Sequence, residues 1–156
     1  MECRERLEQY LREEGVPFEV MAHDLAYTMQ EVAATLHISG KQVAKVVMVK
    51  AGESLAMFVI PAAARLDLAQ VREELGTDKA RLAKESEFAG TFPDCAPGAM
   101  PPFGNLYDVP VYVDQELAQR GEIVFRVGTH EDTMKVAYAD FARLAQPIVG
   151  AFAYLA

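Results

Sequence analysis

Apolar side chains recur at helical spacing in the first part of the chain. Leu7, Tyr10 and Leu11 form one stripe, which predicts a helix over 2–14 that ends at Gly15. Similar patterns, with polar residues at the starts, predict shorter helices or helical turns at 28–36, 67–76, 86–90, 114–118 and 140–147.

Polar N-cap residues mark where four of these helices begin. Thr28 and Glu31 have the spacing of a capping box, in which two side chains satisfy free backbone N–H groups at a helix start. Aspartates stand at three other starts, as Asp67, Asp114 and Asp140.

Two apolar runs, 43–49 and 55–60, flank a turn at 51–53 and predict a β-hairpin. Both runs are almost continuously apolar, which is typical of central strands buried on both faces. Further strands are expected at 18–21, 81–83, 109–113, 122–127 and 133–138. No repeat or linker interrupts the chain. The sequence therefore predicts one α+β domain over 1–156, with a mixed, curved, barrel-like sheet surrounded by helices.

Composition is that of an ordinary globular domain, with 156 residues, of which 51% are apolar and 24% charged. No apolar run reaches the roughly 18 residues of a membrane span, and the charged start has no signal-peptide core. We therefore expect a cytoplasmic protein with no membrane partner. In a reducing cytosol, Cys3 and Cys95 are expected to be free thiols.

The net charge of −8 comes from 15 basic and 23 acidic residues. It argues against a protein that coats DNA by charge alone, but it is compatible with local recognition of a nucleic-acid end. None of the three histidines has a cysteine or histidine at zinc-ligand spacing, and no phosphate-binding glycine motif is present. We expect no metal and no cofactor.

Lys45 is a lone cation within the apolar run VAKVVMV. Burying an unpaired ammonium is costly, so the side chain must reach a cleft, a partner or a ligand. From the pattern alone, the more common arrangement is an edge lysine whose stem packs while its charge reaches water.

The segment 93–104, PDCAPGAMPPFG, has too much proline and glycine for a helix or strand and predicts a shaped loop. Gly98 opens a Gly-x-x-x-Pro stretch whose backbone N–H groups can point into a pocket, as in sites that bind an oxyanion. The alternative is a rigid surface connection.

Gly128, Thr129 and His130 follow a predicted strand, where a histidine can act as a general base or orient a carbonyl or water. A solvated turn histidine is the simpler alternative. His23, in the loop before Thr28, is a weaker candidate.

The sequence gives little support to a covalent mechanism. None of the three serines lies in a Gly-x-Ser-x-Gly motif, and no cation near Cys95 in sequence would activate its thiol. An enzyme of this sequence would activate water with positioned polar groups and backbone amides.

Taken together, these residues resemble one family, the YbaK-like aminoacyl-tRNA deacylases, whose domain also occurs as an editing module inserted in bacterial prolyl-tRNA synthetases. The resemblance covers nearly the whole chain in order. It is carried by HDLAYTMQEVA at 23–33, VAKVVMV at 43–49, VIPAAARLDL at 59–68, CAPGAMPPFG at 95–104, VPVYVD at 109–114, IVFRVGTH at 123–130 and DFARLAQP at 140–147.

The resemblance implies hydrolysis of the ester between a mischarged amino acid and the 3′-terminal adenosine of tRNA, read mainly at the CCA end. It makes Lys45 the functional lysine, Gly98 the start of the loop whose backbone contacts the substrate, and His130 the histidine found in some branches. Substrate contacts are expected around these three residues, at His23, Ala99, Met100, Pro101, Pro102, Gly128 and Thr129.

Synthetase catalytic and anticodon-binding segments are absent from the sequence, so editing would act in trans, with an aminoacyl-tRNA synthetase as a possible partner. The alanine-clearing branch has asparagine after the lysine, whereas this chain has Val46, so alanyl specificity is not implied. Two alternatives stay open. One is a non-catalytic module that binds an amino acid, a nucleotide or a tRNA end to regulate a synthetase, and the other is a small esterase or amidase.

Overall fold

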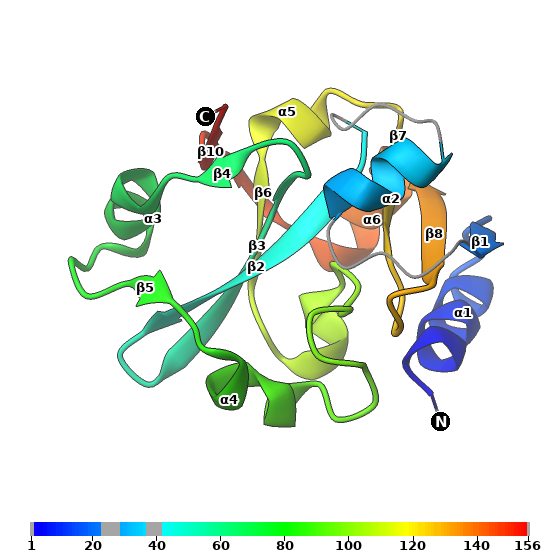
Figure 1. Cartoon of the computed structure of the whole chain (residues 1–156), viewed down its shortest axis with the longest axis horizontal. Helices are drawn as coiled ribbons and strands as arrows, with labels where there is room; N and C mark the ends of the chain where they lie inside the picture. The colour runs from blue at the N-terminus through cyan, green and yellow to red at the C-terminus, as the bar shows by residue number, and fades with distance from the viewer. Residues whose placement is uncertain (1, 23–28, 37–41, 156) are drawn as a thin grey trace.

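The computed structural model describes residues 2–22, 29–36 and 42–155 (Figure 1). Its α-helices are α1 (Cys3–Glu13), α2 (Met29–Leu36), α3 (Leu68–Leu75), α4 (Glu85–Phe88), α5 (Gln115–Ala118) and α6 (Tyr138–Ala145), with short 3-10 turns at Ala89–Thr91 and Gly104–Tyr107. Its strands are β1 (Glu19–Ala22), β2 (Ala44–Ala51), β3 (Ser54–Pro61), β4 (Arg65–Leu66), β5 (Arg81–Leu82), β6 (Val111–Asp114), β7 (Glu122–Arg126), β8 (Asp132–Ala137), β9 (Ile148–Gly150) and β10 (Ala153–Tyr154).

The strands form three sheets, with orders β5-β2-β3-β6-β9, β1-β8-β7 and β10-β4. The largest is mixed, because β2 pairs with β3 antiparallel while β3–β6 and β6–β9 are parallel. A single parallel bridge between Val43 and Val124 links the start of β2 to β7. The predicted single α+β domain with a mixed sheet and surrounding helices is confirmed, whereas its barrel-like curvature is not.

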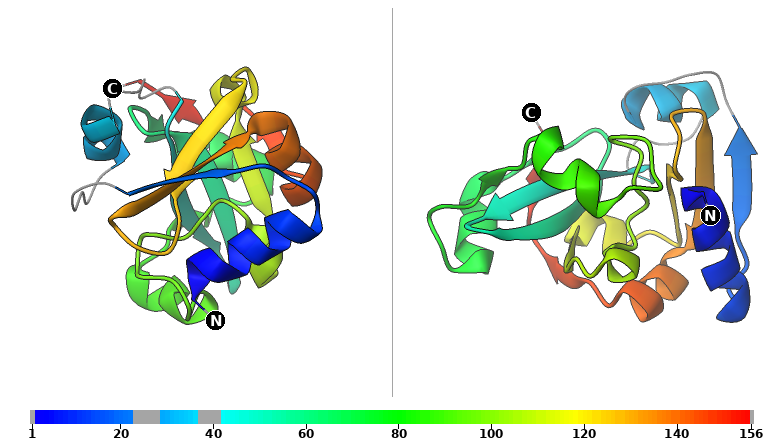
Figure 2. Two further views of the ribbon diagram at one scale, coloured as in Figure 1. Left: turned by 90° about the vertical axis from the view of Figure 1, so that its right-hand side faces the viewer. Right: turned by 90° about the horizontal axis from the view of Figure 1, so that it is seen from below.

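The elements spread along one long axis of the molecule. Figures 1 and 2 show α3 and the tip of the β2–β3 hairpin at one end, with α1 and β1 at the other. The loop that contains Gly98 lies between these ends, near the middle of the molecule. No helix in the described part of the chain has both the length and the apolar character needed to cross a membrane.

Two of the three N-cap predictions that fall on described residues are confirmed. Asp67 Oδ1 accepts hydrogen bonds from the N–H groups at the start of α3, and Asp114 Oδ2 accepts one from the Glu116 N–H in α5. The prediction for Asp140 is wrong, because β8 runs directly into α6 and the N-cap is Ala137. Thr28 lies outside the described residues.

The hairpin differs from its prediction on one side. Strand β3 is buried from Ala56 to its end, as expected of a central strand, but β2 is only half-buried at Lys45 and the two valines after it. The reason is that β5 pairs only with Val49 and Lys50, so the outer edge of β2 beside Lys45 has no ladder partner among the described residues. This open edge is where the candidate site forms.

Packing of the 93–104 loop is anchored by aromatic side chains. Phe103 is fully buried and meets Phe125 and Phe141 edge-on, with ring centroids 5.8 and 5.5 Å apart. Gly104 beside it has no room for a side chain, since a Cβ would lie 2.5 Å from the Val109 carbonyl oxygen. The predicted loop is thus confirmed, and its second half is part of the core.

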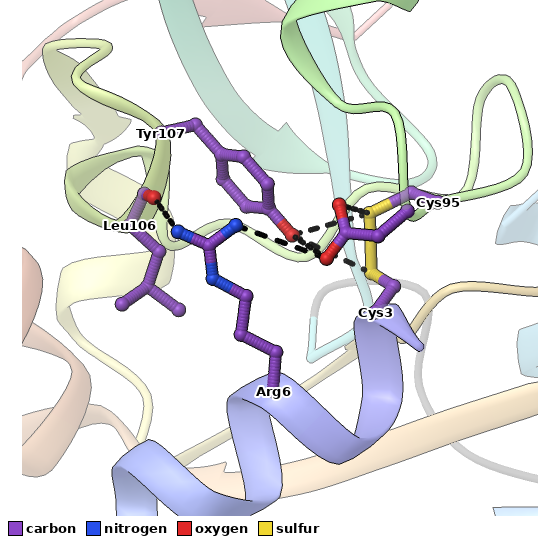
Figure 3. The surroundings of a disulfide bond; sticks show 6 residues. Cys3, Arg6, Cys95, Leu106 and Tyr107 are labelled. Atoms are coloured by element: carbon purple, nitrogen blue, oxygen red, sulfur yellow. Dashed lines mark hydrogen bonds and ion pairs between the residues drawn. A yellow bond between two sulfur atoms is a disulfide. The ribbon is translucent and has the colours of Figure 1, made fainter. Parts of the chain in front are cut away.

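A disulfide bond joins Cys3, at the start of α1, to Cys95 in the same loop (Figure 3). The prediction of two free thiols is therefore wrong. The cysteines are 92 residues apart, and they meet because α1 packs on the loop, where the Cys3 N–H donates to the Asp94 carbonyl oxygen at 3.1 Å. Arg6 stacks over the Tyr107 ring beside the bond, 4.5 Å from its centroid.

Candidate active site

A small pocket lies where the open edge of β2 faces β7 and the Gly98 loop. It encloses about 260 Å³ of empty space including its mouth. Polar and apolar atoms both form its wall, and Lys45 and Arg126 are the two cations among its described lining residues. The lining residues are Met29, Ala44, Lys45, Val46, Gly98, Met100, Phe125 and Arg126.

Lys45 is half-buried at the wall of this pocket, on β2 opposite Ile60. Burial lowers the pKa of its ammonium below the ordinary lysine value, and the nearby positive charge of Arg65 lowers it further. No carboxylate among the described residues lies within ion-pair distance of Lys45. Its ammonium is therefore available to hydrogen-bond an oxygen of a ligand.

Arg126 is the pocket residue that the sequence reading missed. It is 8% exposed, at the end of β7, and its Nη1 donates to the Gly98 carbonyl oxygen at 3.3 Å. Burial lowers its pKa from the ordinary arginine value, an effect that the charge of Glu31 partly opposes. The signal that could have found it is the one that found Lys45, a single cation inside an apolar strand.

The loop from Ala96 to Ala99 is held by residues at the end of β7 and in the turn after it. Gly128 makes two backbone hydrogen bonds to it, donating to the Ala99 carbonyl oxygen at 2.8 Å and accepting from the Ala96 N–H at 2.9 Å. His130 Nε2 lies 3.0 Å from the Pro97 carbonyl oxygen. Gly128 and His130 therefore hold the backbone of this loop by hydrogen bonds.

Gly98 itself is exposed, with a φ of 80° that favours glycine. Its N–H and that of Met100 have no hydrogen-bond acceptor among the described residues. Both residues line the pocket, so their N–H groups are candidates for the donors predicted for a Gly-x-x-x-Pro loop, and this role stays a prediction.

Three other predicted loop residues do not line the pocket. Ala99, Pro101 and Pro102 are buried, and they connect Gly98 to the aromatic core at Phe103. These three residues therefore support the loop without lining the pocket. Met100, in contrast, is one of the lining residues.

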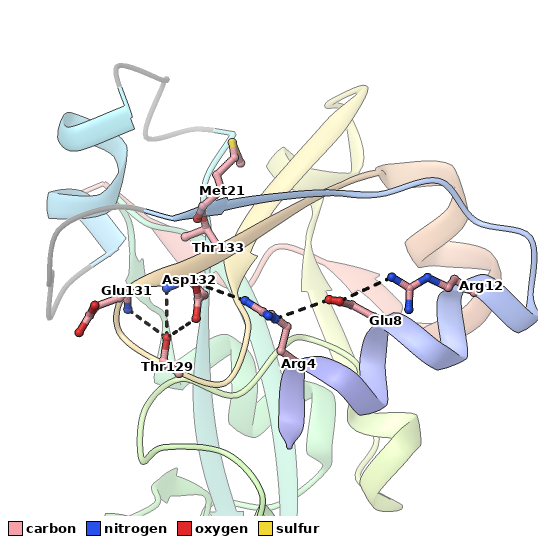
Figure 4. A network of polar contacts seen from close by, with 8 residues as sticks. All are labelled: Arg4, Glu8, Arg12, Met21, Thr129, Glu131, Asp132 and Thr133. Atoms are coloured by element: carbon pink, nitrogen blue, oxygen red, sulfur yellow. Dashed lines mark hydrogen bonds and ion pairs between the residues drawn. The ribbon is translucent and has the colours of Figure 1, made fainter. Parts of the chain in front are cut away.

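Gly128 and Thr129 are not among the residues that line the Lys45 pocket, and they lie beside the start of α1. Gly128 has a φ of 91°, and a Cβ there would lie 3.0 Å from the Cβ of Cys3. The Thr129 hydroxyl donates to Asp132 Oδ2 at 2.9 Å and accepts from the N–H groups of Glu131 and Asp132 (Figure 4). Its oxygen shapes the β7–β8 turn. His23 lies outside the described residues.

A larger hollow near the C-terminus is a weaker candidate. Its buried polar side chain is that of Asp114, whose oxygens already accept hydrogen bonds from the backbone N–H groups of Glu116, Phe152 and Ala153. A carboxylate satisfied in this way has a structural role. The hollow also has no lysine, arginine or histidine among its lining residues.

One cluster among the described residues combines three groups of the kinds that bind metals, namely Cys3, Asp94 and Cys95. Both sulfur atoms are joined in the disulfide, so they are not thiolate ligands in this state. The cluster lies on the α1 side of the loop and outside the pocket's lining.

The pocket combines features suited to cleaving a small ester. A cation and two backbone N–H groups can stabilise negative charge on a carbonyl oxygen, and the apolar side chains in the lining, such as Met29 and Phe125, can contact a small side chain. None of the described lining residues is a serine, threonine or cysteine, so they supply no side-chain nucleophile of these types.

The chain is similar to known proteins that act on or charge tRNA. The Multifunctional Ser/Thr-tRNA deacylase ProXp-y of Escherichia coli (strain K12) is 28% identical over 148 residues, which cover 92% of this chain and 88% of that protein. A Proline--tRNA ligase of Shouchella clausii (strain KSM-K16) is 27% identical over 125 residues, which cover 74% of this chain but only 22% of the ligase.

The fold is also shared with known structures. A crystal structure of a proposed trans-editing enzyme for prolyl-tRNA synthetase superposes with a TM-score of 0.85 at 21% identity, covering 97% of both chains. The family model described as "Aminoacyl-tRNA editing domain" matches residues 23–144, a range that contains Lys45, the Gly98 loop and His130. The predicted family resemblance is thus confirmed, and the chain belongs to the aminoacyl-tRNA editing domain family.

Proposed function

We propose that this aminoacyl-tRNA editing hydrolase cleaves the ester that joins a mischarged amino acid to the 3′-terminal adenosine of tRNA, with Lys45 and the Gly98 loop as its reaction centre. The observation that carries the proposal is the pocket itself. It is lined by Lys45, whose ammonium has no carboxylate partner within the described ranges, and by Gly98 and Met100, whose N–H groups have no acceptor there. Hydrolysis needs no cofactor in this scheme.

In the proposed reaction, water attacks the ester carbonyl carbon and the carbonyl oxygen takes up negative charge. The N–H groups of Gly98 and Met100 hydrogen-bond that oxygen, and Lys45 holds a ribose, carbonyl or phosphate oxygen of the substrate. The bond to the ribose oxygen then breaks. One proton of the attacking water passes to that oxygen, which becomes the ribose hydroxyl, and the other is released to solvent. The amino acid leaves as its carboxylate. The lining residues offer no side chain for a covalent intermediate.

The size of the pocket suggests the class of amino acid. Met29, Met100 and Phe125 border the pocket, whose volume apart from its open mouth is only about 30 Å³, far below the volume that usually holds drug-sized ligands. A small side chain fits this volume better than an aromatic one. The name of the related ProXp-y, a Ser/Thr-tRNA deacylase, agrees with small side chains.

Recognition of tRNA at the CCA end would use a few local cations, because the net charge of −8 opposes a broad electrostatic grip. Arg65 is an exposed cation suited to binding the CCA end, because it lies close enough for its charge to act on Lys45. Arg81 is less suited, because it makes two hydrogen bonds to Glu87 at 2.7 and 2.8 Å. Tight binding would then require a further partner, for which a synthetase is the natural proposal. A cytoplasmic location stays a prediction.

The direct test offers the purified protein a panel of tRNAs charged with alanine, serine, threonine, cysteine or proline on several tRNA bodies. Loss of the ester is followed with time. We expect hydrolysis of at least one substrate with a small side chain. Binding of these tRNAs without any hydrolysis would favour the alternative of a non-catalytic module.

A further inference from the structure

Three consecutive peptide groups of the loop are each held at the carbonyl oxygen by a residue between 126 and 130. The carbonyl oxygens of Pro97, Gly98 and Ala99 contact His130 Nε2, Arg126 Nη1 and the Gly128 N–H at 3.0, 3.3 and 2.8 Å. The first partner is the imidazole of His130, a predicted site residue, and another is the backbone N–H of Gly128. The third is a buried arginine.

Holding a carbonyl also fixes the direction of the N–H in the same peptide group, because the two point in opposite directions across a trans peptide. Fixing the carbonyls of Pro97 and Ala99 therefore orients the N–H groups of Gly98 and Met100. Gly98 has a φ of 80° and no side chain to restrict it, so the peptide after it depends on hydrogen bonds to keep its orientation. The Ala99 N–H of this peptide donates to the Ala96 carbonyl oxygen at 3.0 Å, and its carbonyl side needs a second hold. Arg126 supplies that hold.

We propose that Arg126 is a positioning residue, which fixes the peptide group after Gly98 so that the loop's N–H groups keep the orientation needed for ester hydrolysis. This inference rests on the proposed function for the meaning of that orientation. The contact between Arg126 and Gly98 itself does not depend on it.

An arginine suits this task better than a lysine. Its guanidinium is planar and fixed in shape, and its charge strengthens the hydrogen bond to a carbonyl oxygen. A buried guanidinium also carries a desolvation cost, so a site that needed only packing would be at least as stable with an apolar residue. Arg126 therefore makes most sense as a residue kept for the geometry of the loop.

The test compares two variants. Arg126→Met keeps a long side chain but removes its hydrogen-bond donors, and Arg126→Lys keeps the positive charge but removes the planar guanidinium group. Arg120→Met is the matched control, because Arg120 follows α5, pairs with Glu116 and lies outside the pocket. For each protein, single-turnover and steady-state hydrolysis give kcat and KM. Amide hydrogen exchange is measured by NMR at Ala99, whose N–H bonds to Ala96, and at Gly128.

We expect Arg126→Met to lower kcat by about 10- to 100-fold with little change in KM, as a misplaced catalytic group does. Its Ala99 and Gly128 amides should exchange faster than those of the unchanged protein, and its melting temperature should not fall. Arg126→Lys should recover only part of the rate, and Arg120→Met should match the unchanged protein in all measurements.

Three results would overturn the inference. They are an unchanged kcat in Arg126→Met, a loss of rate without faster exchange at Ala99, and a large drop in melting temperature in both Arg126 variants. If no mischarged tRNA is hydrolysed at all, the proposed function fails separately. The exchange measurement still decides whether Arg126 holds the Gly98 peptide.

Discussion

The Nε2 atom of His130 lies 3.0 Å from the carbonyl oxygen of Pro97. A carbonyl oxygen only accepts hydrogen bonds, so Nε2 carries the hydrogen, and Nδ1 is the basic nitrogen of the neutral ring. His130 does not line the pocket with Lys45, although its Cε1 lies 3.7 Å from where a Cβ on Gly98 would be. This contact fits a residue that braces the loop, whereas the sequence reading expected a catalytic histidine.

His130→Gln separates the two roles of this histidine. A glutamine amide can replace the Nε2–H donor but cannot act as a general base near neutral pH. If His130 braces the loop, His130→Gln should keep most of the hydrolysis rate, while His130→Ala should lose about tenfold, the value of one hydrogen bond. Equal, large losses in both variants would instead support general-base catalysis. The rate is measured on the best substrate of the tRNA panel.

The Cys3–Cys95 disulfide should contribute strongly to stability, because it closes a long loop between α1 and the segment before Gly98. Removing such a bond typically lowers the free energy of unfolding by about 2–5 kcal/mol. We expect dithiothreitol to lower the urea midpoint of the unchanged protein. The double variant Cys3→Ala/Cys95→Ala, already destabilised, should not respond to dithiothreitol. A midpoint in the unchanged protein that is independent of reductant would contradict the bond.

Lys45 should give the protein a pH-dependent stability of known sign. Burial lowers its pKa in the folded state, so between the folded and unfolded pKa values the unfolded chain binds more protons. The cost in folding free energy of burying the charged Lys45 is therefore complete below the pKa of Lys45 in the folded protein. This cost disappears as pH rises through the ordinary lysine pKa of about 10.4. Lys45→Met should gain the most stability near pH 7, and its advantage should shrink toward about pH 10.

Lys50→Met is the control for this measurement. Lys50 lies on the same strand but forms an ion pair with Glu87 at 3.2 Å. Its removal should not produce a gain that declines with pH. A stability difference for Lys45→Met that stays constant with pH would show that the ammonium carries no burial penalty. Urea unfolding at several pH values provides the data.

Predictions that depend on neighbouring residues are confirmed more often than features that depend on contacts between distant parts of the chain. The caps at Asp67 and Asp114 involve residues two or three positions away, so the pattern contains all the information that they need. Strand β9 escaped prediction because it has only three residues after Pro147 and is recognisable only by its pairing with β6. Ile148 and Val149 alone do not distinguish a strand from an apolar tail.

The site was predicted in part for the same reason. Lys45 stands out because a charge interrupts an apolar strand, and Gly98 because glycine opens a proline-rich loop. Arg126 has the same signal as Lys45 but was not singled out. The structural use of the Thr129 hydroxyl, and the meeting of Cys3 with Cys95, depend on packing that no local pattern contains.

The most direct test of the assignment is the hydrolysis rate of Lys45→Met on the best mischarged tRNA, compared with Lys50→Met and the unchanged protein. Losing one charged contact to a reacting ester costs about 2–4 kcal/mol, so Lys45→Met should be slower by about 30- to 1,000-fold. Its melting temperature should be unchanged or higher, and Lys50→Met should keep its rate. A folded Lys45→Met that hydrolyses the same ester at the rate of the unchanged protein would contradict the placement of the reaction centre at this pocket.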